Sequence, residues 1–313
     1  WVETEHVDAT CTADGYTKYE CSECKRIGYS GEQAFRTEIF AKLPHTDLNQ
    51  NYRCDDCDAW IFDEYDETYF MEIGTLDDLL NICDDLSGYY KLTADIDLGY
   101  KYFAPIGTKQ RPFTGFFFGN GHKIRNLAYN ADTDGLMGGL FGYNNGIILD
   151  LTVENFSVRA TKTTNNAECV AGAIAAYNHG TIKDCKLIGS TYVDIVMTSV
   201  VNNNGNKAQA DNFIVGGIAA VNDGNGTGKV EGCSVAGSIT TYIVAYSSVR
   251  ADKTMDAVLS NFRKICSEEI LHVSFGGVIG RNQGMLSNCN VTANVTVNRT
   301  AIATLWEAVG QAY

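Results

Sequence analysis

The chain has few of the features that mark membrane-spanning or nucleic-acid-binding proteins. None of its 313 residues lies in an apolar run of about 18, the length that a membrane-spanning helix requires. Lys and Arg number 24 against 38 Asp and Glu, whereas binding to phosphates requires a basic surface. We therefore expect no membrane-spanning segment in this chain and no nucleic-acid partner.

Short motifs of catalytic and metal sites are also scarce. The five histidines are scattered and form no His-Glu-x-x-His pattern, and residues 223–226 lack the spacing of an EF-hand calcium loop. Residues 1–5 have neither the basic nor the apolar stretch of a signal peptide. Because the chain starts with Trp, we expect a fragment of a longer protein.

Acidic charge is concentrated in the first third of the sequence. Residues 1–100 carry 23 acidic and 7 basic side chains, whereas residues 101–313 carry 15 and 17. Such an asymmetry indicates a separate acidic region at the N-terminus.

The rest of the sequence repeats one pattern four times: a glycine, an apolar pair, a small residue and then Asn-x-Gly. The copies are residues 139–146, 172–180, 217–224 and 277–284. A segment with apolar residues at its second, fifth and seventh positions follows Gly146, Gly180, Gly228 and Gly284. Positions five and seven alternate as in a strand with one buried face. Because each unit is too small to bury its own apolar face, we expect a solenoid of stacked strands.

Stacking predicts two columns of equivalent residues. Thiols are small apolar fillers, so one column is expected in the core, comprising Leu127, Leu151, Cys185, Cys233 and Cys289. Asparagine amides can hydrogen-bond along a stack, and Asn tolerates the left-handed backbone of tight turns. The second column is therefore expected at a turn, comprising Asn144, Asn178, Asn222 and Asn282.

The first copy begins Gly139-Leu140-Phe141-Gly142, and a lead-in precedes it that includes residues 90–98, 105–107 and 119–127. This sequence resembles the GLUG motif over residues 74–300. GLUG repeats occur in bacterial cell-surface proteins and in some immunoglobulin-cleaving peptidases. The resemblance implies an all-β fold, a right-handed parallel β-helix. Any immunoglobulin-cleaving activity would lie in a domain absent from this chain.

Two helices are expected around the solenoid. Residues 75–86 are amphipathic, with Leu76, Leu79, Leu80, Cys83 and Leu86 on one face, and Thr75 with Asp78 forms a cap-like start. Since an open solenoid exposes an unpaired edge, we expect this helix to cap it. A second helix is expected at residues 254–270.

The predicted organisation has three parts. Residues 1–62 form a small Cys-rich module like a zinc ribbon, and residues 63–90 form a linker with the capping helix. Residues 91–313 form the β-helix, with insertions near 191–213 and 240–272.

The N-terminal cysteines form two Cys-x-x-Cys knuckles, Cys21 with Cys24 and Cys54 with Cys57. Paired knuckles can place four thiolates around a structural zinc ion. Disulfides and unmodified thiols remain alternatives. This region resembles short cysteine and histidine modules found in tandem on bacterial surface proteins, in which case Cys11, His6 or His45 could join the site. Four filled positions leave no room for substrate, so the zinc would be structural.

Catalysis on a β-helix requires clustered acids and bases on one strand face. The equivalent exposed positions are Thr152, Lys186, Ser234 and Asn290, and the flanking ones are Asp150, Asp184, Gly232 and Asn288. Asp95 and Asp97 alternate in a strand and could form a paired acid, although solvation of the first coil or bonding to its turns is favoured. We therefore expect no enzyme activity.

Aromatic residues crowd residues 60–118, where they could stack on sugars or, as we favour, fill the junction between cap and first coils. The sequence thus predicts a non-catalytic extracellular or cell-surface protein that acts as a scaffold for adhesion or display. Its partner would be a host or matrix protein or a glycan. A carbohydrate-binding module is the alternative, and a polysaccharide-active enzyme is less favoured.

Overall fold

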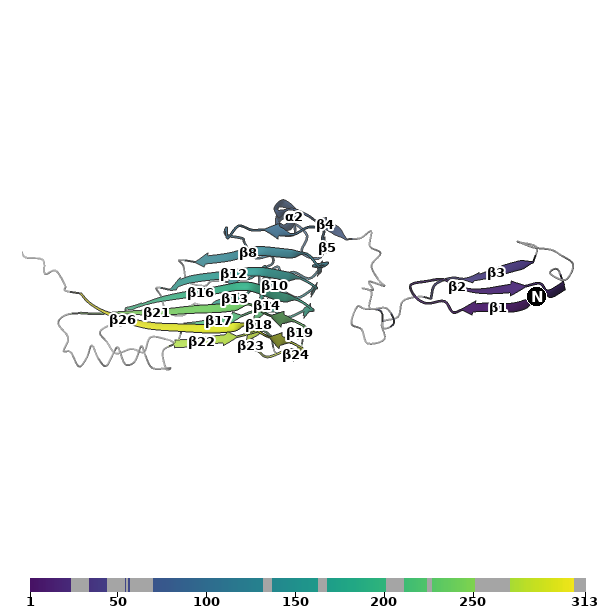
Figure 1. Cartoon of the computed structure of the whole chain (residues 1–313). Helices are drawn as coiled ribbons and strands as arrows, with labels where there is room; N and C mark the ends of the chain where they lie inside the picture. Colours follow the sequence, from purple (N-terminus) through teal and green to yellow (C-terminus); the bar gives the residue numbers. More distant parts are fainter. Residues whose placement is uncertain are drawn as a thin grey trace, which may run out of the picture. The chain divides into compact units, whose positions relative to one another are not determined.

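A computed structural model describes residues 1–23, 34–43, 54, 56, 70–131, 137–162, 168–200, 211–223, 227–250 and 271–306. The chain divides into two compact units, Trp1–Tyr69 and Phe70–Tyr313 (Figure 1). The predicted Cys-rich module lies within the first unit, and the predicted helix at 254–270 lies outside the described residues.

The first unit contains an antiparallel sheet of order β1-β2-β3, made of β1 (Val2–Val7), β2 (Gly15–Glu20) and β3 (Phe35–Phe40). All six residues of β1 are exposed. On β2, only Gly15 and Thr17 are buried. Because so little apolar surface is covered, this sheet needs support from elsewhere in its unit.

The second unit is built from four parallel sheets. One has the order β22-β17-β13-β9, made of β9 (Met137–Gly138), β13 (Cys169–Gly172), β17 (Asp211–Gly216) and β22 (Leu271–Gly276). The next, the asparagine sheet, has the order β10-β14-β18-β23, made of β10 (Phe141–Asn144), β14 (Ala175–Asn178), β18 (Ala219–Asn222) and β23 (Ile279–Asn282).

The two larger sheets extend to the start of the unit. The seven-stranded sheet has the order β24-β19-β15-β11-β7-β5-β4, made of β4 (Met71–Ile73), β5 (Tyr89–Leu92), β7 (Phe116–Phe118), β11 (Ile147–Leu149), β15 (Thr181–Lys183), β19 (Lys229–Glu231) and β24 (Met285–Ser287). The eight-stranded sheet has the order β25-β20-β16-β12-β8-β6, made of β6 (Ile96–Asp97), β8 (Lys123–Ala131), β12 (Thr152–Lys162), β16 (Lys186–Val200), β20 (Ser234–Val235) and β25 (Asn290–Val291). Two long strands, β21 (Ser238–Arg250) and β26 (Asn294–Trp306), continue it beyond β20 and β25.

Each sequence repeat contributes to every sheet in the same order along the chain, with one strand per sheet except that the third and fourth repeats each give two strands to the eight-stranded sheet. Equivalent residues lie in register, as Ile147 with Thr181 and Thr181 with Lys229. Figure 1 shows the strands of successive repeats side by side. The fold of this unit is therefore all-β, parallel and β-helix-like, as the repetition predicts.

The predicted core positions are buried in the first three repeats. Ile148, Ile182 and Val230 are fully buried, and so are Leu151, Cys185 and Cys233. A hydrogen bond with Cys185, together with burial, raises the pKa of the Cys233 thiol, so this sulfur stays protonated and acts as a core atom. Cys289 in the fourth repeat packs against the same core but is partly exposed.

The pairing of β8 with β12 shows that Leu127 does not belong to the predicted column. This residue is fully buried, but it pairs with Phe156 and not with Leu151, because Lys123 pairs with Thr152. The turn at Asn120 and Gly121 closes the first coil differently from the later ones, since both residues have positive φ. An alignment of the first coil with the later repeats, based on sequence alone, is therefore out of register after this turn.

The asparagine column forms as predicted. Asn144 Nδ2 donates to Asn178 Oδ1 at 2.8 Å, Asn178 Nδ2 donates to Asn222 Oδ1 at 2.8 Å, and Asn222 Nδ2 donates to Asn282 Oδ1 at 2.9 Å. The expectation of left-handed backbone at these residues is wrong. The left-handed positions are instead Asp150, Asp184, Gly232 and Asn288, with φ between 47° and 63°.

Helix α2 (Leu76–Asn81) is shorter than predicted and buries a different face. Thr75 and Asp78 form the expected capping box. Leu79 and Ile82 are fully buried against the core, whereas Leu76, Leu80 and Cys83 are exposed. The helix ends at Asn81, and its C-cap residue Ile82 packs into the core together with Leu79.

The structure places parts of both predicted insertions in strands. Residues 191–200 belong to β16 and residues 240–250 to β21, so both segments extend the eight-stranded sheet. Buried Val193 and Ile195 alternate with exposed Tyr192 and half-buried Asp194, which is the pattern of a strand with one buried face. Residues 201–210 and 251–270 lie outside the described residues.

Candidate functional site

The predicted strand-face column is present but chemically poor. Thr152 pairs with Lys186, Lys186 with Ser234 and Ser234 with Asn290 on the eight-stranded sheet. The column holds one cation and no carboxylate. It therefore lacks the pair of an acid and a base that glycoside hydrolysis requires.

The flanking column, Asp150, Asp184, Gly232 and Asn288, forms the corner before the strands of the eight-stranded sheet. Asp and Asn tolerate left-handed backbone, and Gly adopts it freely, which explains these residue types. Asp150 Oδ2 also accepts a hydrogen bond from the backbone of Gly121 at 3.1 Å. The two aspartates thus have a structural explanation at the turn.

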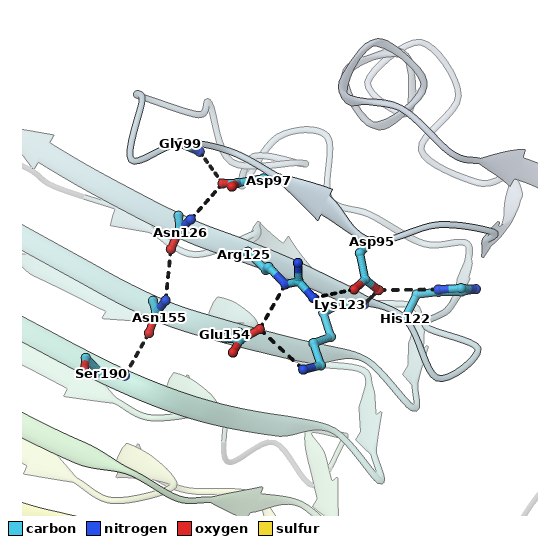
Figure 2. A network of polar contacts seen from close by, with 10 residues as sticks. All are labelled: Asp95, Asp97, Gly99, His122, Lys123, Arg125, Asn126, Glu154, Asn155 and Ser190. Carbon is cyan, nitrogen blue, oxygen red and sulfur yellow. Dashed lines mark hydrogen bonds and ion pairs between the residues drawn. The ribbon is translucent and has the colours of Figure 1, made fainter.

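Asp95 lies in a charged network with residues of β8 and β12 (Figure 2). Its Oδ2 accepts from Arg125 at 2.6 Å, and its Oδ1 accepts from the backbone of Lys123 at 3.0 Å. Glu154 lies 3.0 Å from Arg125 and 3.4 Å from Lys123, and His122 lies 3.4 Å from Asp95. The backbone hydrogen bond and then Arg125 lower the pKa of Asp95, so it is an ion-pair partner and a poor proton donor.

Asp97 begins a second polar column in Figure 2. Its Oδ1 accepts from the backbone of Gly99 and from Asn126 Nδ2, both at 2.8 Å. Asn155 Nδ2 donates to Asn126 Oδ1 at 3.0 Å, and the backbone of Ser190 donates to Asn155 Oδ1 at 2.9 Å. These bonds join four successive strands, so Asp97 and Asp95 bind their neighbours separately and do not form a paired acid.

Two tyrosines and a histidine lie on the asparagine-sheet side. The rings of Tyr143 and Tyr177 stack at 4.4 Å with an angle of 10°. The Tyr177 hydroxyl donates to Glu168 at 2.9 Å, and burial raises the pKa of Tyr177. His179 Nε2 lies 2.8 Å from Asp223, but its Nδ1 is buried and without a hydrogen-bond partner. Each tyrosine covers one face of the other, so the pair joins neighbouring repeats.

The aromatic residues near the start of the second unit fill its interior. The buried members of this group are Phe103, Phe113, Phe116, Phe117 and Phe118. Tyr90 is also buried, and desolvation raises its pKa to about 12. The favoured prediction thus fits these residues. Tyr100 and Tyr102 differ, because they are 53% and 71% exposed.

Sequence reasoning missed a group of exposed tyrosines on the long strands. Tyr192 of β16 and Tyr242 of β21 are 43% and 39% exposed, and their ring centroids lie 5.5 Å apart. The available signal was alternation, since buried Val193 follows Tyr192 and buried Thr241 precedes Tyr242. Both tyrosines lie in the predicted insertions, although the alternation there is that of a strand.

In the first unit, the structure brings Cys54 beside Cys11. Their sulfur atoms lie 3.7 Å apart, and Asp56 offers an oxygen within the same cluster. Tetrahedral zinc with Zn–S bonds of about 2.3 Å requires a similar sulfur–sulfur distance, so the pair fits a thiolate site. Cys21 is disulfide-bonded, so it is not available as the zinc thiolate that the paired knuckles predict, and at this residue the structure has the disulfide alternative. Cys24, Cys57 and His45 lie outside the described residues, and His6 bonds to Thr17 and Asp8.

Comparison with known proteins supports the repeat. The family described as the GLUG motif matches residues 272–296, which include the fourth repeat, whereas the sequence resemblance began at the first copy. A solved structure titled IgA1 Protease is similar with a TM-score of 0.31 and 11% identity, covering 94% of this chain and 24% of that chain. This chain thus spans about a quarter of that protein, and the likeness assigns no activity. A search of curated proteins returns no match.

The described helices were also compared with the length and hydropathy of membrane spans. In the part of the chain that the structure describes, none is long and apolar enough to cross a membrane.

Proposed function

We propose that this chain is a non-catalytic piece of an extracellular or cell-surface bacterial protein that serves adhesion or display. Its four parallel sheets would close into a right-handed β-helix of GLUG type, with α2 covering the first coil. The asparagine column carries this proposal, because in-register amide bonds between repeats make a stiff support whose exterior can vary.

The absence of enzyme activity is part of the proposal. The carboxylates predicted as possible acids have structural partners: Asp95 binds Arg125, Asp97 binds Asn126, and Asp150 bonds to a neighbouring turn. Catalytic acids instead tend to have pKa values raised toward neutrality, whereas the pKa values of Asp95 and Asp97 are lowered.

The first unit is proposed to be held by structural zinc. Cys11 and Cys54 would supply thiolates, with the remaining ligands from nearby residues such as Asp56. Metal binding would compensate for the small apolar core of the β1–β3 sheet.

Surface labelling of intact cells tests the proposed location. Antibodies raised against the chain should bind unbroken cells of the source organism, and external protease should remove the signal. Labelling only after lysis would contradict an extracellular location. Adhesion is tested by applying the purified chain to immobilised matrix proteins and glycans, where saturable binding to at least one of them is expected.

A further inference from the structure

The eight-stranded sheet presents a row of outward side chains that the proposed function does not yet use. Strand register places two columns side by side on this face. One consists of Tyr102, Ala128, Ser157, Tyr192, Thr240 and Thr296. The other consists of Asn130, Arg159, Asp194, Tyr242 and Asn298. We call these two columns the tyrosine face.

We propose that the tyrosine face binds a linear, uncharged glycan laid across the strands. This inference rests on the proposed adhesive function, since it names the class of partner and the surface that meets it.

The rings of three tyrosines on this face are exposed to water. Tyr102, Tyr192 and Tyr242 are 71%, 43% and 39% exposed, although their alternate neighbours Val193 and Thr241 are fully buried. Tyr192 and Tyr242 contact each other, and Tyr102 meets the buried ring of Tyr129 at 6.5 Å between centroids. Large aromatic side chains held in water on one face indicate a surface that meets a ligand.

The hydroxyls of Tyr192 and Tyr242 are also available for hydrogen bonds to a ligand. In contrast, Tyr90 and Tyr129 donate to backbone carbonyls and Tyr177 donates to Glu168. Within the described residues, the hydroxyls of Tyr192 and Tyr242 have no such partner. An exposed tyrosine can therefore offer both an aromatic face and a hydrogen bond to a ligand.

The chemistry of the face matches that of a sugar. A pyranose ring has a face of C–H groups that packs on an aromatic ring, and a rim of hydroxyls that hydrogen-bond to amides, hydroxyls and charged groups. Here Asn130, Asp194, Thr240 and Asn298 supply those polar groups around the tyrosines. Ala128 and Ser157 are small, which leaves room between Tyr102 and Tyr192.

The spacing suits an extended chain. Neighbouring strands lie ~4.8 Å apart, which is close to the advance of one pyranose in an extended glycan. Tyr102 and Tyr192 are three strands apart, or about 14 Å at that spacing, so they would contact different sugars of one chain.

The charge balance of the tyrosine face favours an uncharged ligand. Arg159 and Asp194 are the two charged members of the face, and they lie 3.7 Å apart as an ion pair. The neighbouring charges of the same sheet, Lys123, Arg125 and Glu154, pair with one another and with Asp95. Because Arg159 and Asp194 balance, the tyrosine face carries no net charge of its own and offers a polyanion no net attraction, although Lys186 of the same sheet is exposed. Binding to a protein instead is an outcome of the test below, since tyrosine and arginine are also common at protein interfaces.

The test uses the full chain, a panel of soluble neutral polysaccharides (β-glucan, mannan and galactan) and polygalacturonate as the acidic comparison. Binding is measured by affinity electrophoresis and calorimetry. We expect at least one neutral polymer to bind and the double variant Y192A/Y242A to weaken that binding at least tenfold. Phe35→Ala, at a 50% exposed aromatic residue of the other unit, is the matched control and should bind like the parent chain.

Each other outcome overturns the inference. Undiminished binding by Y192A/Y242A would place the glycan elsewhere, and preference for polygalacturonate would exclude a neutral ligand. If no polysaccharide binds but a matrix protein does, this inference fails while the adhesive function stands. If nothing binds and intact cells are not labelled, both fail. An unchanged thermal unfolding midpoint confirms that the variant is folded.

Discussion

Asn178 lies in the middle of the asparagine column, where its side chain both donates and accepts. Asn178→Ala would leave the buried Asn222 Oδ1 without its column donor, and it would leave Asn144 Nδ2 with only the longer bond to Gly146 O at 3.4 Å. Unsatisfied buried groups cost ~1–3 kcal/mol each, so we expect the free energy of unfolding to fall by roughly 2–4 kcal/mol. Urea denaturation followed by circular dichroism measures this.

Asn282→Ala is the matched control at the exposed end of the same column. It removes an acceptor of Asn222, whose Nδ2 also lies 3.3 Å from Gly228 O and 3.2 Å from Met285 O. The loss should stay below about 1 kcal/mol, as is usual for an exposed hydrogen bond with alternatives. Equal losses at the two positions would show that the column does not depend on burial.

Asp95 makes stability depend on pH. Its backbone bond to Lys123 and its pairing with Arg125 lower its pKa in the folded chain. The stabilisation is therefore complete above the ordinary aspartate pKa, and it is lost as the pH falls through the lowered folded value, below about pH 4. Asp95→Asn should reduce stability at neutral pH and flatten this acid limb in pH-dependent urea melts. If the loss of stability at low pH is unchanged in Asp95→Asn, that loss comes from other carboxylates, such as Asp97, whose pKa is also lowered.

At the scale of elements, α2 and its C-cap contribute Leu79 and Ile82 to the core. Leu79 is fully buried, whereas Leu80 is 44% exposed. Leu79→Ala should lower the free energy of unfolding by about 2–5 kcal/mol through lost burial and an added cavity. Leu80→Ala should cost less than about 1 kcal/mol, because the exposed side chain already contacts water. Thermal unfolding of the two variants provides the comparison.

If α2 acts as a cap, it should also protect the edge of the first coil from association. If α2 covers the first coil, Leu79→Ala should also increase association through the exposed strand edge, detectable by light scattering. A destabilised Leu79→Ala chain that stays monomeric would contradict capping but not burial.

At the scale of the whole molecule, the two compact units are expected to unfold separately. If zinc binds Cys11 and Cys54, a chelator should lower the unfolding temperature of the first unit alone, and Cys11→Ser should do the same. Elemental analysis of the purified chain should find about one zinc per chain. Cys83→Ser, at an exposed cysteine of the second unit, is the control and should retain the metal. A chain without zinc and with unaltered melting would exclude the site.

The repeat could be predicted because it depends on residues that are close together in the sequence. Alternation decides which side of a strand faces inward, and Ile148, Cys185 and Val235 follow that rule without knowledge of their neighbours. The amide column followed in the same way from Asn-x-Gly. The missed features depend on more distant residues: the pairing of Leu127 depends on where the first turn closes, and the buried face of α2 depends on the sheets beneath it.

The amino-acid sequence alone determined the period of the second unit, its buried apolar and thiol positions, and its bonded asparagines, since spacing along the chain fixes all three. Only the tertiary structure decided which residues share a column on the outer face, because that depends on the register between strands far apart in sequence. Tyr102 and Tyr192 share a column although 90 positions apart in the numbering, and Cys11 meets Cys54, for this reason.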